Sequence, residues 1–204
     1  MQELLIATNN EGKIKEFRAL LEELNLRLRT PESMNLYVEV DEVGTSYASN
    51  ASLKARAFSE ASGMWCLADD SGLEVDVLGG LPGLHSARLI GPERSDSDRR
   101  QHLLSLLAPH PRPWTARFRS AVVLANPEGE IELAEGECPG EVIPEERGSM
   151  GFGYDAIFLL QGLNSTMAEL EMETKNRLSH RARSVQAILP VLRSKMGLLP
   201  KSGT

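Results

Sequence analysis

The sequence has few cysteines and no long apolar run. Only Cys66 and Cys138 occur among its 204 residues, which excludes a disulfide-stapled secreted scaffold. The first residues, MQELLIATNN, lack the basic segment and apolar core of a signal peptide, and no stretch approaches the ~18 apolar residues of a membrane span. We therefore expect a cytoplasmic protein with reduced thiols and no membrane partner.

Basic residues are also in deficit. The chain has 22 Lys and Arg against 29 Asp and Glu, a net charge of −7. Sequence-independent binding of nucleic acid needs a broad basic surface, so we expect no nucleic-acid partner. A small anionic ligand needs only a local cluster of cations. No His/Cys cluster suggests zinc, so any bound metal should be a hard ion that prefers oxygen ligands.

The hydrophobic pattern predicts one α/β domain over residues 1–204. Hydrophobic residues make up 41% and charged residues 25% of the chain, which is ordinary for a globular protein, and no repeat or linker interrupts it. Apolar runs predict buried strands at 4–8, 64–68 and 156–160, and a hairpin at 115–125 and 130–137. Helical spacing predicts helices at 14–24, 46–62, 95–108 and 179–195, the last kinked or shortened by Pro190. Strands alternating with helices around a hairpin give a mixed sheet.

The segment ATNNEGK (7–13) passes from a strand into a helix that should begin near Lys13. Backbone N–H groups at a helix N-terminus favour an anion, and a lysine in the first turn adds a mobile charge. The two glycines that the Walker pattern needs ahead of its lysine are missing. An ordinary turn with a solvated lysine explains these residues equally well.

The segment DEVGTSYASNASLKA (41–55) combines acidic residues with a helix start. Asp41 and Glu42 are possible oxygen ligands for a divalent ion, and Asn50 and Lys54 are i, i+4 neighbours on one helical face. The alternative is that the acidic pair only precedes a helix N-terminus, where such residues are common.

The segment LADDSGLEVDVLGGLPGLHSAR (67–88) places Asp69 and Asp70 at the predicted end of a buried strand. Successive strand residues face opposite ways, so one aspartate should look into a cleft and the other toward backbone N–H groups or a cation. The glycines that follow predict a tightly shaped loop. A plain turn is the alternative, but a carboxylate after an apolar run is energetically costly unless it has a cation or a water molecule as a partner.

Two further segments carry aromatic rings and cations. GFGYD (151–155) offers rings that could stack on a flat ligand, or two core aromatics in a glycine-rich turn. KNRLSHR (175–181) places Lys175, His180 and Arg181 within seven residues, suited to phosphate or to base carbonyl oxygens. A basic surface turn that caps the last helix is the alternative.

Together the five segments resemble, in order and spacing, the signatures of the inosine triphosphate pyrophosphatases, which act on noncanonical purine nucleoside triphosphates. The resemblance covers nearly the whole chain. It implies an elongated α/β fold with two lobes around a deep central cleft, a homodimer, and Mg²⁺-dependent hydrolysis of ITP, dITP and XTP to the monophosphate and pyrophosphate. Attack of water on a triphosphate needs a base, a divalent cation and cationic side chains, and the sequence supplies candidates for each.

The resemblance also implies roles for individual residues. Asp70 matches the proton acceptor and a metal-linked carboxylate, and Asp41, favoured over Glu42, matches a metal ligand. His180 and Arg181 should select 6-oxo purines while Phe152 stacks on the ring. The implied substrate contacts are Thr8, Asn9, Asn10, Glu11, Gly12, Lys13, Ser71, Phe152, Gly153, Tyr154, Asp155, Lys175, His180 and Arg181.

Three positions depart from the family pattern. Ser49 replaces a usual Glu, His85 stands where an aromatic residue is common, and Ala156 replaces a usual Pro. Two other functions stay open: a pyrophosphatase for other modified nucleotides, and a module that binds a nucleotide without cleaving it. The carboxylates argue against the second, because a pure anion binder gains nothing from negative charge beside phosphate.

Overall fold

The computed structural model describes residues 1–91 and 93–198. This part of the chain divides into two compact units. Unit 1 comprises Met1–Asp70, Ala121–Gly136 and the chain from Ala182 onward, and unit 2 comprises Ser71–Ser120 and Glu137–Arg181. Each unit has its own hydrophobic core.

Six strands occur among the described residues, hydrogen-bonded in the order β2-β1-β3-β4-β5-β6. β1 pairs in parallel with β2 and β3, whereas β6 pairs antiparallel with β5, so the predicted mixed sheet is confirmed. The strands are β1 (Gln2–Ile6), β2 (Leu26–Arg29), β3 (Cys66–Val75), β4 (Trp114–Ala125), β5 (Ile131–Val142) and β6 (Phe158–Leu160).

The α-helices are α1 (Glu11–Leu20), α2 (Tyr47–Ser62), α3 (Asp96–Leu107), α4 (Met172–Leu178) and α5 (His180–Lys195). α2 and α3 begin where their capping residues predict, whereas α1 begins at Glu11, ahead of the start expected near Lys13, and ends at Leu20 rather than at 24. Short 3-10 turns are η1 (Glu32–Met34), η2 (Asp76–Leu78), η3 (Gly83–Arg88), η4 (Asp155–Ile157) and η5 (Met167–Glu169). No helix in residues 1–91 or 93–198 is long and apolar enough to cross a membrane.

Several other expectations about element bounds need correction. β3 continues to Val75, so Asp69 and Asp70 lie within the strand rather than at its end, and Gly72 belongs to the strand rather than to a loop. The strand predicted from 156 begins at Phe158, because the preceding residues form η4. α5 is not shortened by Pro190, which lies inside it. β2 and α4 were not predicted.

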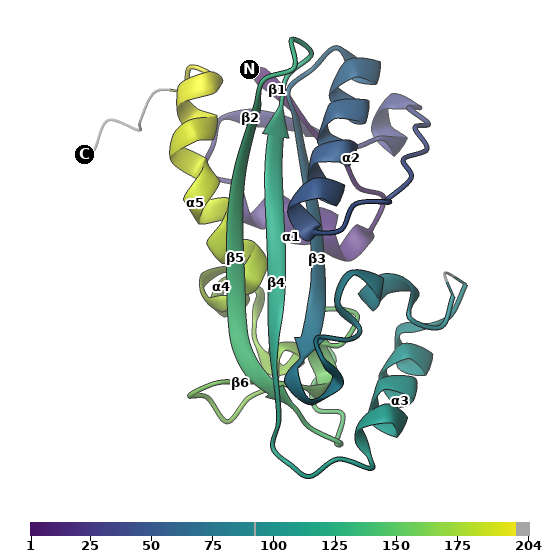
Figure 1. Cartoon of the computed structure of the whole chain (residues 1–204). Coiled ribbons are helices and arrows are strands. Elements are labelled where there is room, and N and C mark those ends of the chain that lie inside the picture. The colour runs from purple at the N-terminus through teal and green to yellow at the C-terminus, as the bar shows by residue number, and fades with distance from the viewer. Residues whose placement is uncertain (92, 199–204) are drawn as a thin grey trace, which may run out of the picture. The chain divides into compact units, whose positions relative to one another are not determined.

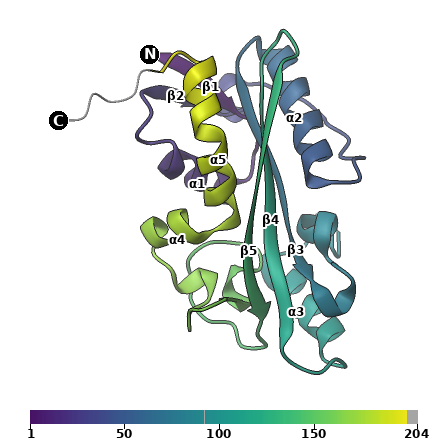
Figure 2. The ribbon, with the colours of Figure 1, turned by 60° about the vertical axis from the view of Figure 1, so that its left-hand side comes forward.

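In unit 1, α1 and α5 lie on one side of the strands and α2 on the other (Figure 1, Figure 2). Phe17 of α1 and Val185 of α5 share a core with strand residues such as Leu67. On the other side, Ser59 of α2 donates a hydrogen bond to the carbonyl of Ala125. Because the strands are covered on both faces, adjacent residues of β3 meet different helices.

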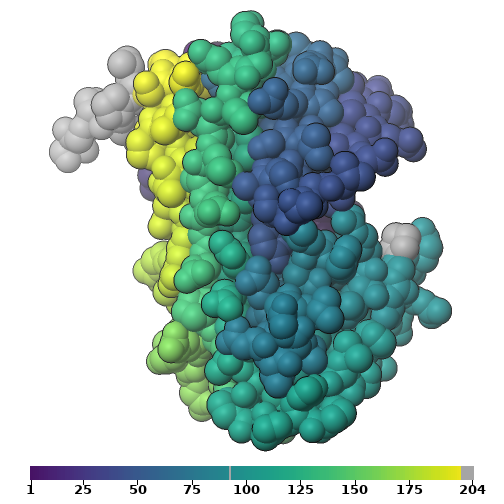
Figure 3. All heavy atoms as spheres, viewed as in Figure 1, coloured from purple at the N-terminus to yellow at the C-terminus, as the bar shows by residue number. Residues whose placement is uncertain are grey.

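The end of α5 is tied to the hairpin of β4 and β5. In Figure 3 the yellow atoms of α5 lie against the green atoms of this hairpin in unit 1. Lys195 Nζ lies 3.2 Å from Glu130 Oε2 and 3.6 Å from Glu132 Oε1. The turn itself is closed by bonds between Asn126 and Glu130, as the NPEG sequence predicts.

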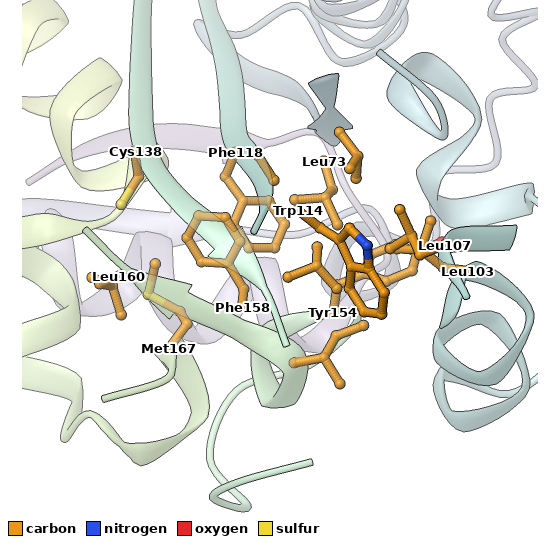
Figure 4. Packing of buried hydrophobic residues seen from close by; sticks show 14 of the residues in the cluster. Leu73, Leu103, Leu107, Trp114, Phe118, Cys138, Tyr154, Phe158, Leu160 and Met167 are labelled. Atoms are coloured by element: carbon orange, nitrogen blue, oxygen red, sulfur yellow. The ribbon is translucent and has the colours of Figure 1, made fainter. Parts of the chain in front are cut away.

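In unit 2, the inward side chains of β4 form a core with α3 and β6 (Figure 4). Trp114, Ala116 and Phe118 alternate with exposed residues, so one face of the strand is buried. The ring of Phe118 lies 4.6 Å from that of Phe158 between centroids. Leu103 of α3 packs into the same cluster.

Candidate active site

The start of α2 presents a buried amide toward β3. Ser46 caps the helix and Ser49 returns the bond to its backbone, so a capping box forms although Ser49 replaces the usual Glu. The N–H of Gly44 donates to Asn50 Oδ1 at 2.8 Å, which turns the Asn50 amide nitrogen toward Asp70 Oδ2 at 3.1 Å. A Cβ at Gly44 would lie 2.5 Å from Asn50 Oδ1, so this position needs glycine.

Glu42, Asn50, Lys54 and Asp70 form what we call the Asp70 cluster of unit 1. Lys54 Nζ lies 3.0 Å from Glu42 Oε1 and 3.7 Å from Asp70 Oδ1. The i, i+4 spacing of Asn50 and Lys54 brings both to one carboxylate, as the helix pattern predicts. Two carboxylates therefore converge on a single ammonium group.

Asp70 is buried, and its charge is costly there. Burial raises the pKa of Asp70 above its ordinary value, and the nearby carboxylate of Glu42 adds to that effect. Lys54, Lys13 and the hydrogen bond from Asn50 oppose the rise but do not cancel it. A carboxylate with a raised pKa is a better proton acceptor near neutral pH than an exposed one.

Asp69 points to the other face of β3. Its Oδ2 lies 3.1 Å from Lys13 Nζ, in the first turn of α1. The prediction that the two aspartates face opposite ways, and that Asp69 meets a cation, is confirmed. Asn10 caps α1 by accepting from the Lys13 N–H at 3.0 Å, and Thr8 Oγ1 accepts from the Asn10 N–H at 3.2 Å. The exposed side chains of Asn9 and Glu11 stand in the same turn.

Two of the three predicted metal ligands come together. Glu42 shares Lys54 with Asp70, whereas the side chain of Asp41 is exposed and Lys54 is bonded to its neighbour instead. Within residues 1–91 and 93–198, no group of three or more His, Cys, Asp or Glu side chains is arranged to hold a metal ion. Two carboxylates suffice for Mg²⁺, which usually takes one or two together with substrate phosphates and water. The donor set around Asp70 therefore fits this ion.

In unit 2, Phe152 is surrounded by cations, and we call Ser71, Phe152, Asp155, Lys175 and Arg181 the Phe152 cluster. Asp155 Oδ2 accepts from Lys175 Nζ at 2.6 Å and from the Phe152 N–H at 2.9 Å. Lys175 Nζ lies 5.3 Å and Arg181 Cζ 5.8 Å from the centroid of the Phe152 ring. Arg181 Nη2 also donates to Ser71 Oγ at 2.9 Å.

A glycine permits this close approach. A Cβ at Gly151 would lie 2.9 Å from Lys175 Nζ and would collide with the carboxylate of Asp155. Gly151 also has a φ of +82°, which a side chain rarely adopts. Gly151 of GFGYD is therefore required by the packing of the ion pair.

The last motif is not a basic surface turn. Lys175, His180 and Arg181 are all buried, Lys175 on α4 and the other two in the first turn of α5. The His180 ring stacks on Phe118 with centroids 4.8 Å apart and planes inclined by 15°. The imidazole is thus fixed in one plane by an aromatic neighbour.

The two aromatic residues of GFGYD have different surroundings: one fits a ring that stacks on a ligand, and the other is a core residue. Phe152 is half-buried among cations, as a ligand-stacking ring would be. Tyr154 belongs to the unit 2 core, its hydroxyl donating to the carbonyl of Ser86 at 2.9 Å. Burial raises the pKa of Tyr154 to about 12, so this phenol stays protonated. Its role is packing.

Sequence reasoning missed Phe118 and two side chains of α3. The alternation of β4 placed Phe118 on the buried face but gave no sign that His180 would stack on it. Asp96 and Arg100 of α3 bond the backbone of Gly153, and no pattern in the sequence marks that contact.

Comparison with known proteins assigns the family. The profile of the Ham1 family matches residues 4–191. A dITP/XTP pyrophosphatase of Desulforamulus reducens is 43% identical over 190 residues, covering 93% of this chain and 94% of that protein. The dITP/XTP pyrophosphatase of Bacillus subtilis is 39% identical over 193 residues, covering 94% of this chain and 98% of that protein.

Solved structures agree with that assignment. A HAM1 protein from Coxiella burnetii superposes with a TM-score of 0.84 at 32% identity, over 95% of this chain and all of that one. A nucleoside-triphosphatase, dITP/XTP pyrophosphatase, from Mycobacterium abscessus gives a TM-score of 0.72 at 38% identity, over 93% of this chain and all of that one.

Proposed function

The chain belongs to the Ham1 family, and from this premise we propose that it hydrolyses noncanonical purine nucleoside triphosphates to the monophosphate and pyrophosphate. ITP, dITP and XTP are the substrates. The enzyme is thus a nucleoside triphosphate pyrophosphatase that clears these nucleotides from the pool. The observation that carries the proposal is the buried Asp70, which shares Lys54 with Glu42 and accepts a hydrogen bond from Asn50.

Asp70 is the general base. Its carboxylate takes a proton from the attacking water, the water oxygen bonds to phosphorus, and the α–β anhydride bond breaks to release pyrophosphate. Asn50 holds Asp70 Oδ2 at 3.1 Å, so the carboxylate keeps one orientation. Lys54, which lies 3.7 Å from Asp70 Oδ1, is a cation that can offset the developing negative charge.

The carboxylates of Glu42 and Asp70 are the residues that would hold Mg²⁺. The ion, when bound, offsets the negative charge of the triphosphate and polarises the phosphoryl group. Without such an ion, two carboxylates would repel an anionic substrate. Lys13 and the capped N-terminus of α1 add a cation and backbone N–H groups suited to phosphate oxygens, with Thr8 to Gly12 forming the turn.

The Phe152 cluster recognises the base. Phe152 stacks on the purine ring, and the buried donors of His180 and Arg181 bond the 6-oxo group. Adenine carries an amine at that position, which faces these donors without an acceptor to offer. Lys175 is paired with Asp155, and it therefore acts as a fixed donor beside the ring more than as a phosphate ligand. Ser71 orients Arg181.

The test is a pyrophosphate-release assay over ITP, dITP, XTP, ATP and dUTP at equal concentrations, with and without Mg²⁺. We expect the three noncanonical purines to be cleaved at least tenfold faster than ATP or dUTP, and only with the metal present. Preference for dUTP would identify a pyrophosphatase for other nucleotides. ITP binding by calorimetry without turnover would identify a binding module and refute the proposal.

Oligomeric state and location follow the same family expectation. We propose a homodimer that acts in the cytoplasm on free nucleotides, without nucleic acid as a partner. The net charge of −7 argues against a nucleic-acid partner, and the free, buried Cys66 and Cys138 fit a reducing compartment, whereas the dimer rests on the family expectation alone. Light scattering at micromolar concentration, which would give twice the monomer mass of 22.4 kDa, tests the dimer.

A further inference from the structure

Helix α3 holds the backbone of the residue that follows Phe152. Arg100 Nη1 donates to the Gly153 carbonyl at 2.8 Å, and Asp96 Oδ2 accepts from the Gly153 N–H at 2.7 Å. Asp96 and Arg100 are four residues apart, so both project from one face of α3. Two side chains of one helix thus hold both polar groups of a single glycine.

These bonds restrict Phe152 from both sides. The peptide before Phe152 is held through its N–H by Asp155 at 2.9 Å, and the peptide after it by Asp96. Gly153 has a φ of +60°, a conformation that a hydrogen-bonded clamp can maintain and that glycine adopts without strain. With both flanking peptides fixed, the direction of the Phe152 Cα–Cβ bond is fixed as well, and Lys175 and Arg181 beside the ring limit its rotation.

The clamp is charged and internally braced. Asp96 Oδ1 accepts from Arg99 Nη1 at 3.0 Å, and Arg100 Nη2 donates to Glu146 Oε2 at 2.8 Å. The Arg100 side chain is only 15% exposed, so water competes little for its hydrogen bonds. Hydrogen bonds to charged groups are about twice as strong as neutral ones, which suits a holding function.

We propose that Asp96 and Arg100 are positioning residues for purine recognition, acting through Gly153 to set the position of the Phe152 ring. The inference rests on the proposed function, because it takes Phe152 as the stacking partner of the base. It adds helix α3 to the parts of unit 2 that determine substrate preference.

Arg100→Ala should release the Gly153 carbonyl and let the Phe152 ring sample several orientations. A misplacement of about 1 Å can cost ~10²-fold in an enzyme, so a partial loss of order predicts roughly a tenfold rise in KM for ITP. The preference for ITP over ATP in kcat/KM should fall by a similar factor. The kcat for ITP should stay within about twofold, since the Asp70 cluster is untouched.

The experiment compares Arg100→Ala, Arg100→Lys and Gln101→Ala in steady-state kinetics with ITP and ATP, alongside thermal melts. Gln101 is exposed on the same helix, which makes its substitution a matched control for helix propensity. Arg100→Lys keeps one charged donor and should recover part of the lost selectivity. The same Arg100→Ala change is also made in a Phe152→Ala background, where it should have no further effect on KM or selectivity.

The outcomes separate this inference from the proposed function. Wild-type protein that fails to cleave ITP refutes the function. Wild-type protein that cleaves ITP, with Arg100→Ala matching Gln101→Ala in KM and selectivity, overturns the inference alone. The inference also fails if Arg100→Ala lowers kcat and melting temperature while KM stays constant, because that is a structural role. An undiminished effect of Arg100→Ala on top of Phe152→Ala contradicts action through the ring.

Discussion

The two units hold their lysines differently. In the Asp70 cluster, Lys54 lies 3.0 and 3.7 Å from two carboxylates and its side chain is 13% exposed, while Lys13, beside Asp69, is 15% exposed. In the Phe152 cluster, Lys175 lies 2.6 Å from one carboxylate with 4% exposed. Lys54 and Lys13 of unit 1 thus stay partly open to solvent, whereas Lys175 of unit 2 is almost fully buried beside a carboxylate and a ring.

This difference matches two kinds of task. A lysine on a flexible stem at a partly open position can exchange a carboxylate for a phosphate oxygen, which is what binding of a triphosphate demands. A buried ion pair packed on an aromatic ring cannot rearrange cheaply, and it therefore presents a fixed surface to a flat base. The Asp70 cluster of unit 1 is suited to reaction at a charged phosphate group, and the Phe152 cluster of unit 2 to recognition of a flat base by its shape and hydrogen-bonding groups.

The largest effect expected from a test of this difference between the units is a loss of turnover when Asp70 of unit 1 is substituted. Asp70→Asn keeps the size of the side chain but removes the proton acceptor, so kcat with ITP should fall by ~10²–10⁴. ITP binding should suffer much less, because the Phe152 cluster is unchanged. Stopped assays give kcat, and calorimetry with ITP gives affinity. Near-normal turnover of a folded Asp70→Asn protein at saturating ITP and Mg²⁺ would end the assignment of Asp70 as the base.

The next largest effect is on stability, and it compares the two ion pairs directly. Asp155→Ala removes the 2.6 Å partner of the buried Lys175 and the acceptor of the Phe152 N–H. Loss of one member of a buried pair costs about 3–5 kcal/mol. We expect a decrease of that size in the free energy of unfolding, measured by urea denaturation.

Glu42→Gln is the matched change in unit 1. Lys54 keeps Asp70 as a partner, and the Glu42 side chain is 26% exposed, so the free energy of unfolding should change by less than about 1 kcal/mol. Equal losses in the two variants would show that the pairs do not differ in the way their burial indicates.

Local signals in the sequence located most of the fold. Ser46 and Ser95 cap α2 and α3 with reciprocal bonds, and those helices start where the capping residues predict. The alternation from Trp114 to Phe118 correctly gave the buried face of β4. β2 and α4 were not predicted because each is short and neither shows a sustained apolar period.

The end of β3 was misplaced for a physical reason. Charged residues usually end a buried strand, because an unpaired carboxylate there is costly. Here Asp69 and Asp70 each meet a lysine from a helix on their own side, Lys13 and Lys54, so the strand continues through both charges. Partners so distant in sequence cannot be read from local pattern.

Contiguous motifs marked the candidate site residues, but they could not show what surrounds each side chain. Motif letters could not show that Tyr154 packs in the core while Phe152 stands among cations, since both follow a glycine. The resemblance to the family favours Asp41 as the metal ligand, whereas the position of Lys54 favours Glu42. The hold of Arg100 on Gly153 links residues 53 positions apart, which no spacing rule anticipates.

The smallest effect concerns the stability cost of keeping Asp70 charged. Burial raises its folded-state pKa despite Lys54, Lys13 and Asn50, with Glu42 adding to the rise. Between the ordinary and the raised pKa the folded state therefore binds more protons than the unfolded state, and stability falls as pH rises through that window.

Asn does not titrate, and in the Asp70→Asn variant its side-chain oxygen can still accept the hydrogen bond from the Asn50 amide. In metal-free buffer Asp70→Asn should thus melt at a higher temperature than the wild type at pH 8, and the difference should shrink as pH falls through the folded-state pKa of Asp70. Glu60→Gln, at an exposed glutamate of α2, controls for loss of one negative charge. An Asp70→Asn protein that is less stable than the wild type at pH 8 would mean that Lys54 more than compensates for burial, and that the Asp70 cluster is a stabilising ion pair rather than a strained base.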